Sequence, residues 1–241
     1  MHSKLLEKHG LTNKVAGSDY NFRYQKAGNK IVEDVDRLLK EMNIKPTEIY
    51  TGQQMHTDHV VVVDNENGED FVYGKTFKET DGMITSQPKV ALLIKYADCT
   101  PIVLFDPIKR VQGIVHSGWR GTTKKIALTA IRKMETEFGC KREDMLVYVG
   151  PSIDQENYEV GPEVYEAFED FKNRESFFKP QGEKYQMSMT DANVEILLEA
   201  GIKVENMEVE RASTYTDESL HSARKEGTEY QLNGLLTMIK S

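Results

Sequence analysis

Cys99 and His116 are two residues whose types and spacing could support chemistry at one site. Cys99 precedes an apolar run at Ile102–Phe105, and His116 follows a second apolar run at Val111–Val115. The link Asp106–Arg110 is too short for a parallel crossover, so the two runs are predicted to form an antiparallel hairpin. In that hairpin the start of the first strand lies beside the end of the second. We therefore expect Cys99 and His116 at the same end of the pair.

His56 is a third residue that could support chemistry next to a strand end, because it lies between two strand-like runs, Glu48–Thr51 and His59–Val63. A set of His, Cys and His side chains suits Zn²⁺, and three protein ligands leave a fourth tetrahedral position for water or substrate. On spacing alone, two other interpretations stay open. Cys99 is a small buried side chain beside a hydrogen-bonded His116, or Cys99 is a thiolate nucleophile with His116 as its base.

The numbers of cysteines and histidines limit the size of a metal site. The chain has two cysteines, Cys99 and Cys140, and six histidines. The N-terminal segment has no apolar stretch of signal-peptide length, so we expect a cytoplasmic protein with free thiols and no disulfide framework. A metal site is then expected to hold one ion with three side-chain ligands.

Composition disfavours two classes of partner. The 241 residues include 31 Lys and Arg and 39 Asp and Glu, which gives a formal net charge of −8 at pH 7. This acidic balance disfavours binding to the phosphates of nucleic acids. No apolar run approaches the roughly 18 residues that a membrane-spanning helix needs. We therefore expect neither a nucleic acid nor a membrane as a partner.

The segment after His116 combines features of an anion site. It passes through Gly118 and Gly121 towards an expected helix, and the N-terminus of a helix presents free backbone N–H groups and the positive end of the helix dipole. Arg120 lies between the two glycines and could hold a phosphate or carboxylate through two parallel hydrogen bonds. A plain strand-to-helix turn would use the same glycines, so the signal is not specific by itself.

Hydrophobic spacing predicts a single domain, residues 1–241, that mixes helices and strands. Helices are expected at Ile31–Met42, at Ile126–Phe138 with Thr122 and Thr123 as candidate caps, at Pro162–Phe171, and from Thr190 or Asp191 to Ala200. Besides the four runs named above, strands are expected at Val90–Tyr96, Met145–Val149 and Tyr185–Met189. Helices and hairpins together favour the α+β class, as a layered sandwich of mixed β-sheets with flanking helices.

Four motifs in order resemble the YfiH-like or laccase-domain family, also called the multicopper polyphenol oxidoreductase or peptidoglycan editing factor family. The motifs are Gln54-Met55-His56, Ala97-Asp98-Cys99 followed by Pro101, His116-Ser117-Gly118-Trp119-Arg120-Gly121, and Gly150-Pro151-Ser152-Ile153, with Asp191 and Leu197 further on. The resemblance covers most of the chain. It implies the YfiH-like fold and a zinc site with one ion per chain, built from His56, Cys99 and His116.

The resemblance also implies an activity. The chain is expected to be a purine nucleoside phosphorylase that cleaves adenosine, inosine, guanosine or methylthioadenosine with phosphate, and to deaminate adenosine. Purine nucleosides and phosphate are the expected partners. Besides Cys99, the expected catalytic residues are Asp98 and Arg120, with Asp98 as an acid/base group or as the group that holds a ligand imidazole in its tautomer.

Four residues are expected to bind substrate: Asn21, Gln54, Arg120 and Arg224. Gln54 lies two residues before His56, so on a strand both would face the same side. Asn21 and Arg224 stand at positions where the family has Asn and Arg. The chain departs from the family elsewhere: Lys14 replaces an Arg, Ser213 replaces a Cys, and Leu220–Lys225 replaces an aromatic, arginine-rich motif. These departures concern the substrate-facing wall and leave the three expected ligands unchanged.

Three other functions stay open. One is a cysteine hydrolase that edits cell-wall precursors with Cys99 as the nucleophile, and another is a non-catalytic metal-binding protein. The third is a polyphenol oxidase that depends on copper, since Cu²⁺ outranks Zn²⁺ in affinity for such ligands. A coupled copper cluster would need several more imidazoles than His59 and His221 supply, so a single ion is expected. Oligomer formation is compatible with each of these functions.

Overall fold

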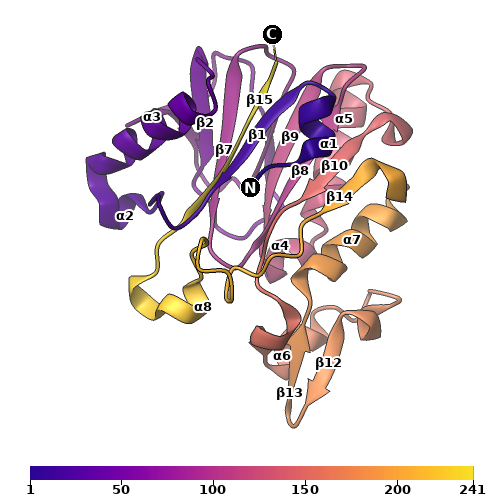
Figure 1. The fold of residues 1–241 in the computed structure, drawn as a ribbon. Coiled ribbons are helices and arrows are strands. Elements are labelled where there is room, and N and C mark those ends of the chain that lie inside the picture. The colour runs from indigo at the N-terminus through magenta and orange to yellow at the C-terminus, as the bar shows by residue number, and fades with distance from the viewer. Residues whose placement is uncertain (241) are drawn as a thin grey trace.

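The computed structural model describes residues 1–240 as two large mixed β-sheets packed face to face, with helices on their outer sides (Figure 1). The first sheet has the strand order β1-β15-β7-β2-β5-β4 and the second has the order β14-β10-β8-β9-β6-β3. A small third sheet, β11-β13-β12, projects from one end of the molecule.

The helices are short except for three of them. They are α1 (Lys4–Lys8), α2 (Tyr24–Ala27), α3 (Ile31–Glu41), α4 (Trp119–Thr123), α5 (Ile126–Phe138), α6 (Pro162–Glu166), α7 (Met189–Glu199) and α8 (Ala223–Glu226). The strands are β1 (Leu11–Ala16), β2 (Glu48–Gly52), β3 (Val60–Val62), β4 (Glu69–Phe71), β5 (Gly74–Phe77), β6 (Gly82–Thr85), β7 (Val90–Tyr96), β8 (Thr100–Asp106), β9 (Val111–Ser117), β10 (Leu146–Val149), β11 (Glu159–Val160), β12 (Phe178–Gln181), β13 (Lys184–Met187), β14 (Met207–Val209) and β15 (Asn233–Ile239).

The buried side chains form a core between each pair of adjacent layers. On the outer face of the first sheet, Ile31, Val35 and Leu38 of α3 pack against apolar side chains of β7 and β15. The facing sides of the two sheets form the central core, which includes Leu92 of the first sheet and Phe105 of the second. Helices α5 and α7 cover the outer face of the second sheet. The structure thus confirms the predicted α+β layered sandwich of mixed sheets with flanking helices.

The predicted hairpin is confirmed. Strands β8 and β9 pair in antiparallel fashion, and the register places Pro101 opposite His116 and Thr100 opposite Ser117. Strand β7 belongs to the first sheet and β8 to the second. The chain therefore crosses from one sheet to the other at the residues between Tyr96 and Thr100, which include Cys99.

Two predicted helices are confirmed, but one predicted cap is wrong. Helix α3 ends one residue earlier than predicted, and α5 ends before Gly139, whose φ of 65° lies in the left-handed region that glycine favours. Thr122 and Thr123 do not cap α5, because both lie in the separate helix α4. Lys125 precedes α5 instead, with a left-handed φ of 55°.

Two predicted boundaries shift near the third sheet. The helix predicted over 162–171 ends at Glu166 as α6, and the chain continues in turns that bury Phe168 and Phe171. Helix α7 begins earlier than predicted because the Ser188 hydroxyl caps it, accepting a hydrogen bond from the backbone N of Asp191. Strand β13 consequently ends before that cap.

Eight strands were not predicted from hydrophobic spacing: β1, β4, β5, β6, β11, β12, β14 and β15. Strand β15 lies between β1 and β7 in the first sheet, and all of its residues are buried. Strand β6 lies between β9 and β3 in the second sheet. Both of these strands border elements that carry the candidate site.

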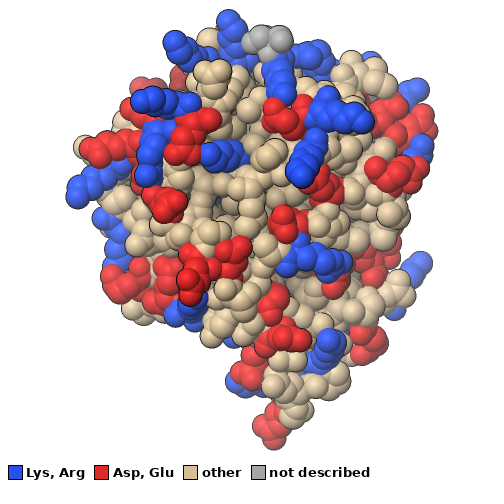
Figure 2. All heavy atoms as spheres, viewed as in Figure 1, with Lys and Arg blue, Asp and Glu red and all other residues tan. Residues whose placement is uncertain are grey.

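Acidic and basic side chains are interspersed over the face of the molecule that Figure 2 shows. On that face, small groups of Asp and Glu alternate with small groups of Lys and Arg, so the net charge of −8 is not gathered in one place there. Within residues 1–240, no helix combines the length and the apolar character needed to cross a membrane.

Candidate metal centre

The structure brings His56, Cys99 and His116 together at one end of the two sheets. One ligand atom from each side chain lies within 4.8 Å of the others, and Cys99 Sγ lies 3.8 Å from His56 Nε2. Two donors held tetrahedrally by one ion at about 2.1 and 2.3 Å lie roughly 3.6 Å apart. The geometry therefore fits a metal ion, and the predicted meeting of the three residues is confirmed.

The three residues differ in exposure. His116 lies in β9 and is buried, Cys99 in the crossing between β7 and β8 is partly exposed, and His56 in the loop after β2 is exposed. The centre is thus anchored in the protein at His116 and open to solvent near His56. An ion held by these three side chains would keep a position free on the open side.

Asp81 holds two of the candidate ligands in place. It is fully buried immediately before β6, and its Oδ1 atom accepts hydrogen bonds from His116 Nδ1 (2.9 Å) and from the backbone N of His56 (3.1 Å). With Nδ1 engaged, His116 presents Nε2 to the centre. We had expected Asp98 as one candidate for holding a ligand imidazole, but the structure gives that role to Asp81.

The other oxygen of the Asp81 carboxylate fixes the loop that carries His56. Its Oδ2 atom accepts hydrogen bonds from the backbone N of Met55 (3.0 Å) and from both the backbone N and the hydroxyl of Thr57 (2.8 Å each). His56 itself has a left-handed φ of 60°, a conformation that costs free energy in residues other than glycine. These contacts provide the support that such a conformation requires.

The ionisable groups of the centre shift one another's pKa. Burial alone would raise the pKa of the Cys99 thiol, but the positive charge and hydrogen bonding of His116 lower it to about 6, with a smaller effect of His56. Burial would lower the pKa of His116, but Cys99 and Asp81 raise it to about 9. Burial likewise opposes ionisation of Asp81, yet the hydrogen bond from His116 holds its pKa well below the usual range. Without a metal, the centre therefore favours a thiolate beside an imidazolium.

Gly118 lets the backbone approach the ligands closely. A Cβ atom at this position would lie 2.6 Å from His56 Cδ2 and 3.0 Å from Cys99 Sγ. The first contact is shorter than Cβ atoms in proteins adopt and the second is at the lower limit, so a larger residue would push against the ligands. The Gly in the predicted motif thus has a steric role at the centre itself.

At the predicted anion site next to Gly118, the source of positive charge differs from the prediction. The helix that this glycine begins is α4, which has only five residues, so its dipole is much smaller than that of the helix we expected. Arg120 is exposed, and its guanidinium carbon lies 4.2 Å from the ring centroid of Trp119. The charge available to an anion here comes from the Arg120 side chain.

Asp98 ties the C-terminal part of the chain to the centre. Its carboxylate accepts hydrogen bonds from the Thr214 hydroxyl and from the backbone N of Arg224, both at 2.7 Å. Its carbonyl accepts a third from the backbone N of Ile153 (3.0 Å). Asp98 has a left-handed φ of 80° and directly precedes Cys99, so these contacts fix the backbone from which the thiol projects.

Arg224 is brought next to the centre through this contact. It lies in α8, its guanidinium donates a hydrogen bond to the carbonyl of Glu159 (3.0 Å), and its guanidinium carbon lies 5.4 Å from the ring centroid of Tyr158. Sequence reasoning did not find Tyr158. The only available signal was a tyrosine shortly after the Gly150-Pro151 motif, which does not separate a core residue from a site residue.

The side chains of Gln54 and Asn21 bind backbone groups. The side-chain amide of Gln54 donates to the carbonyl of Lys95 (2.5 Å) and accepts from its backbone N (2.9 Å). The prediction that Gln54 and His56 share a strand face is wrong, because β2 ends at Gly52. The side chain of Asn21 accepts a hydrogen bond from the backbone N of Arg23 (3.0 Å).

His59 and His221 lie outside the group of candidate ligands. His59 is exposed, and its Nδ1 atom is 3.2 Å from the carbonyl of Glu79. His221 is buried, with Nε2 at 2.7 Å from the carbonyl of Tyr20 and Nδ1 at 3.2 Å from a carboxylate oxygen of Glu226. Both imidazoles contact oxygen atoms of the protein and neither belongs to the group of candidate ligands. The geometry therefore supports a site for a single ion.

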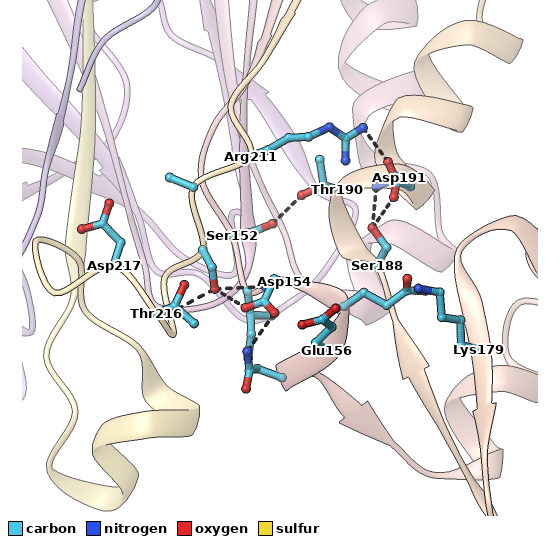
Figure 3. Close-up of a pocket in the computed structure, with 15 residues that line it drawn as sticks. Ser152, Asp154, Glu156, Lys179, Ser188, Thr190, Asp191, Arg211, Thr216 and Asp217 are labelled. Carbon is cyan, nitrogen blue, oxygen red and sulfur yellow. Dashed lines mark hydrogen bonds and ion pairs between the residues drawn. The ribbon is translucent and has the colours of Figure 1, made fainter.

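A separate polar cleft of about 670 Å³ is lined by Ile153 and its neighbours, together with residues around Asp191 and Arg211. Several of its side chains bind one another: Figure 3 shows Ser188 and Arg211 bound to Asp191. Ser213 binds Asp154 in the same cleft. None of the three candidate ligands lines this cleft. The metal centre and this cleft are therefore different places.

Comparisons with known proteins agree with the fold and the motifs. The sequence profile described as "Multi-copper polyphenol oxidoreductase laccase" matches residues 8–238. A purine nucleoside phosphorylase of Bacteroides thetaiotaomicron is 31% identical over 211 residues, covering 82% of this chain and 76% of that protein. A protein named adenosine deaminase RL5, from an unknown prokaryotic organism, is 29% identical over 196 residues, covering 79% of this chain and 74% of its own length. The crystal structure of YlmD from Geobacillus stearothermophilus superimposes with a TM-score of 0.80 at 24% identity, covering 96% of this chain and 91% of that one. The predicted resemblance is confirmed, and the chain belongs to the multi-copper polyphenol oxidoreductase laccase family.

Proposed function

We propose that this protein is a zinc-dependent purine nucleoside phosphorylase that also deaminates adenosine. The observation that carries the proposal is the group of His56, Cys99 and His116 with Asp81 behind it, which is the donor set of a catalytic zinc site with one open position. Relatives named purine nucleoside phosphorylase and adenosine deaminase support it. The proposed substrates are adenosine, inosine, guanosine and methylthioadenosine, each with phosphate.

In phosphorolysis, an oxygen atom of HPO₄²⁻ forms a bond to C1′ of the nucleoside. The bond between C1′ and N9 breaks, its electron pair leaves with the purine, and the proton of the phosphate ends on the purine. A bound zinc ion supplies Lewis acidity at the centre. Arg120 attracts and orients the phosphate through its charge and its paired N–H groups.

The remaining predicted site residues keep proposed roles. Asp98 is the group that takes up and returns a proton, and its two hydrogen bonds hold the carboxylate at a fixed place beside Cys99. Arg224 lies on the same side and contacts the substrate. Asn21 and Gln54 stay proposed substrate contacts, although their side chains already bind backbone groups.

Deamination is the second proposed reaction. Water adds to C6 of adenosine, the bond to the exocyclic nitrogen breaks, and ammonia leaves, so that inosine remains. This reaction consumes no phosphate. The two activities are therefore separable by their products, which are adenine and inosine.

The deciding experiment is incubation of the zinc-loaded protein with adenosine, with and without phosphate, followed by chromatography. We expect adenine only when phosphate is present. Deamination should occur in both cases and give inosine, part of which is cleaved further to hypoxanthine when phosphate is present. His56→Ala should lose zinc and both products, whereas His59→Ala, at an exposed histidine outside the ligand group, should keep them. Adenine formation that is independent of phosphate, or full activity in His56→Ala, would contradict the proposal.

One observation favours a second candidate function. The pKa of Cys99 is lowered to about 6, as in cysteine nucleophiles that are paired with histidine. A hydrolase that edits cell-wall precursors would use this thiolate directly. Such an enzyme would work without metal and would be stopped by alkylation of Cys99, so the activity of the metal-free protein before and after alkylation separates the two functions.

The identity of the ion is testable in the same way. We propose zinc as the resident ion, with Cu²⁺ able to occupy the same ligands in vitro. Any oxidation of phenols should then follow copper loading. Equal rates of phenol oxidation by preparations that hold only zinc and only copper would contradict this assignment.

A further inference from the structure

Tyr158 stands beside the metal centre with a free hydroxyl. It lies directly before β11, and its ring packs against the core formed by α5, α7 and the second sheet. Its carbonyl accepts a hydrogen bond from the backbone N of Met187 (3.0 Å), so its position is fixed from two sides. In the described chain, the Tyr158 hydroxyl makes no hydrogen bond, although the ring is half-buried.

Arg224 connects this tyrosine to the candidate ligands. Its backbone N binds the carboxylate of Asp98, the residue before Cys99, and its guanidinium lies against the Tyr158 ring. One N–H group of the guanidinium donates to the carbonyl of Glu159. The other guanidinium N–H groups have no protein partner within residues 1–240, and the side chain is exposed.

The charges that act on the Tyr158 phenol show which groups surround it. Burial is the main reason why its pKa is raised, and the charged groups that follow are Cys99, Arg224, Asp98 and Arg120. The phenol is therefore protonated at neutral pH and is able to donate a hydrogen bond. Two guanidinium groups and the thiol of the metal centre thus lie within electrostatic range of the phenol.

We propose that Tyr158 donates a hydrogen bond to an oxyanion bound at the metal centre, together with Arg120 and Arg224, and that this oxyanion is inorganic phosphate. Guanidinium groups bind phosphate oxygens through paired N–H donors, and a neutral phenol adds a donor without adding charge. The inference rests on the proposed phosphorolysis for its role in turnover. The binding of phosphate is a separate property that is measured directly.

The test is calorimetric titration of the zinc-loaded protein with inorganic phosphate. Tyr158→Phe removes only the hydroxyl, and Arg224→Met removes the guanidinium but keeps the backbone N that binds Asp98. We expect each variant to bind phosphate about tenfold more weakly, the size of one lost hydrogen bond to a charged group, with unchanged zinc content. In turnover, Tyr158→Phe should raise the KM for phosphate more than it lowers kcat.

Two matched variants control for indirect effects. Tyr185→Phe changes a tyrosine whose ring stacks on Tyr165 in the third sheet, and Arg211→Met changes an arginine that is paired with Asp191 in the separate cleft. Both should bind phosphate as the unaltered protein does. Zinc analysis and thermal unfolding of each variant show whether the fold and the centre are intact.

The possible results separate this inference from the proposed function. Wild-type affinity for phosphate in a folded, zinc-loaded Tyr158→Phe protein would overturn the inference, and so would the absence of phosphate binding to the unaltered protein. If phosphate binds and depends on Tyr158 and Arg224 but no adenine forms, the inference stands and the proposed phosphorolysis fails. If adenine forms and Tyr158→Phe has no effect on phosphate binding or on the KM for phosphate, the proposed phosphorolysis stands and the inference fails.

Discussion

Asp81 and His116 are joined twice. The imidazole Nδ1 of His116 donates to the Asp81 carboxylate at 2.9 Å, and the backbone N of His116 donates to the Asp81 carbonyl at 2.7 Å. The side chains are 0% and 4% exposed, so water does not compete for this contact. The orientation of the imidazole is therefore set by the fold before any metal arrives.

The substitution Asp81→Asn tests this support. It should lower zinc affinity about 10- to 100-fold, the usual effect of removing a carboxylate behind a ligand histidine. An amide also places N–H donors towards the Met55 and Thr57 groups that now donate to Asp81. Competition with a chelator of known affinity measures the change. Asp58→Asn, at an exposed residue of the same loop, should leave the affinity unaltered, and equal effects of the two substitutions would refute the role of Asp81.

Gly118→Ala tests the close approach of the backbone to the ligands. The added methyl group would lie 2.6 Å from the His56 ring, so the ligand or the strand end must move. We expect zinc to be lost at concentrations that saturate the unaltered protein. Gly113→Ala is the control, because Gly113 lies in β9, the strand that ends just before Gly118, and its Cβ would meet side chains at 3.3 Å or more. Zinc binding by Gly118→Ala at full affinity would show that the contact is easily relieved.

Zinc uptake should depend on pH with a defined sign. The pKa of His116 is raised to about 9 in the metal-free centre and that of Cys99 is lowered to about 6. Between these values His116 carries a proton that zinc must displace, so the apparent affinity should rise about tenfold per pH unit from pH 7 towards pH 9. Titrations in buffers of different ionisation enthalpy should show about one proton released per zinc in this range. An affinity that is flat between pH 7 and 9 would be inconsistent with these shifts.

Lys95 gives a prediction about stability. Its amine donates to the carbonyl of Gly52 (3.0 Å), and burial lowers its pKa to about 8, from an ordinary value of 10.5. Between pH 8 and 10.5 the unfolded chain therefore binds more protons than the folded one at this residue, so this group makes the free energy of unfolding rise with pH in that window. Below pH 8 both states hold the proton, and the group adds no further dependence on pH.

Urea unfolding of the unaltered protein and of Lys95→Met at pH 7.5 and pH 10 measures this effect by difference. The stability advantage of the unaltered protein over Lys95→Met should be larger at pH 10. Lys45→Met, at an exposed lysine, should show no such change with pH. A Lys95→Met difference that is the same at both pH values would mean that the amine is not desolvated in the folded state.

The parts of the fold that were predicted have local signals. Helices α3 and α5 show helical spacing of apolar residues, and the β8–β9 hairpin has a short polar link. Strands β1 and β15 were not predicted because their pairing joins the two ends of the chain, with Leu11 opposite Ile239. Strand β15 also begins with Asn233 and Gly234, which are turn-type residues. Whether such a segment forms a strand depends on its neighbours in the sheet, and the local sequence does not identify them.

The candidate site also contains residues with a local sequence signal and residues without one. The three ligands were predicted because His and Cys carry a recognisable chemistry and the hairpin register relates two of them. Asp81 was not predicted, since Asp followed by Gly is typical of turns. Its role depends on the pairing of β6 with β9, which places Gly82 opposite Val115 and so brings the preceding Asp81 beside His116. Only the assembled second sheet contains that information.

The distribution of the ligands over the two sheets has a mechanical consequence. His56 follows a strand of the first sheet, His116 belongs to the second, and Cys99 lies in the crossing between them. An ion bound by all three side chains cross-links the two β-sheets, so the sheets can separate only when the ion is released. At a free concentration of 100 times Kd, such an ion stabilises the folded chain by about 2.7 kcal/mol. Demetallation would thus loosen the architecture as well as stop the chemistry.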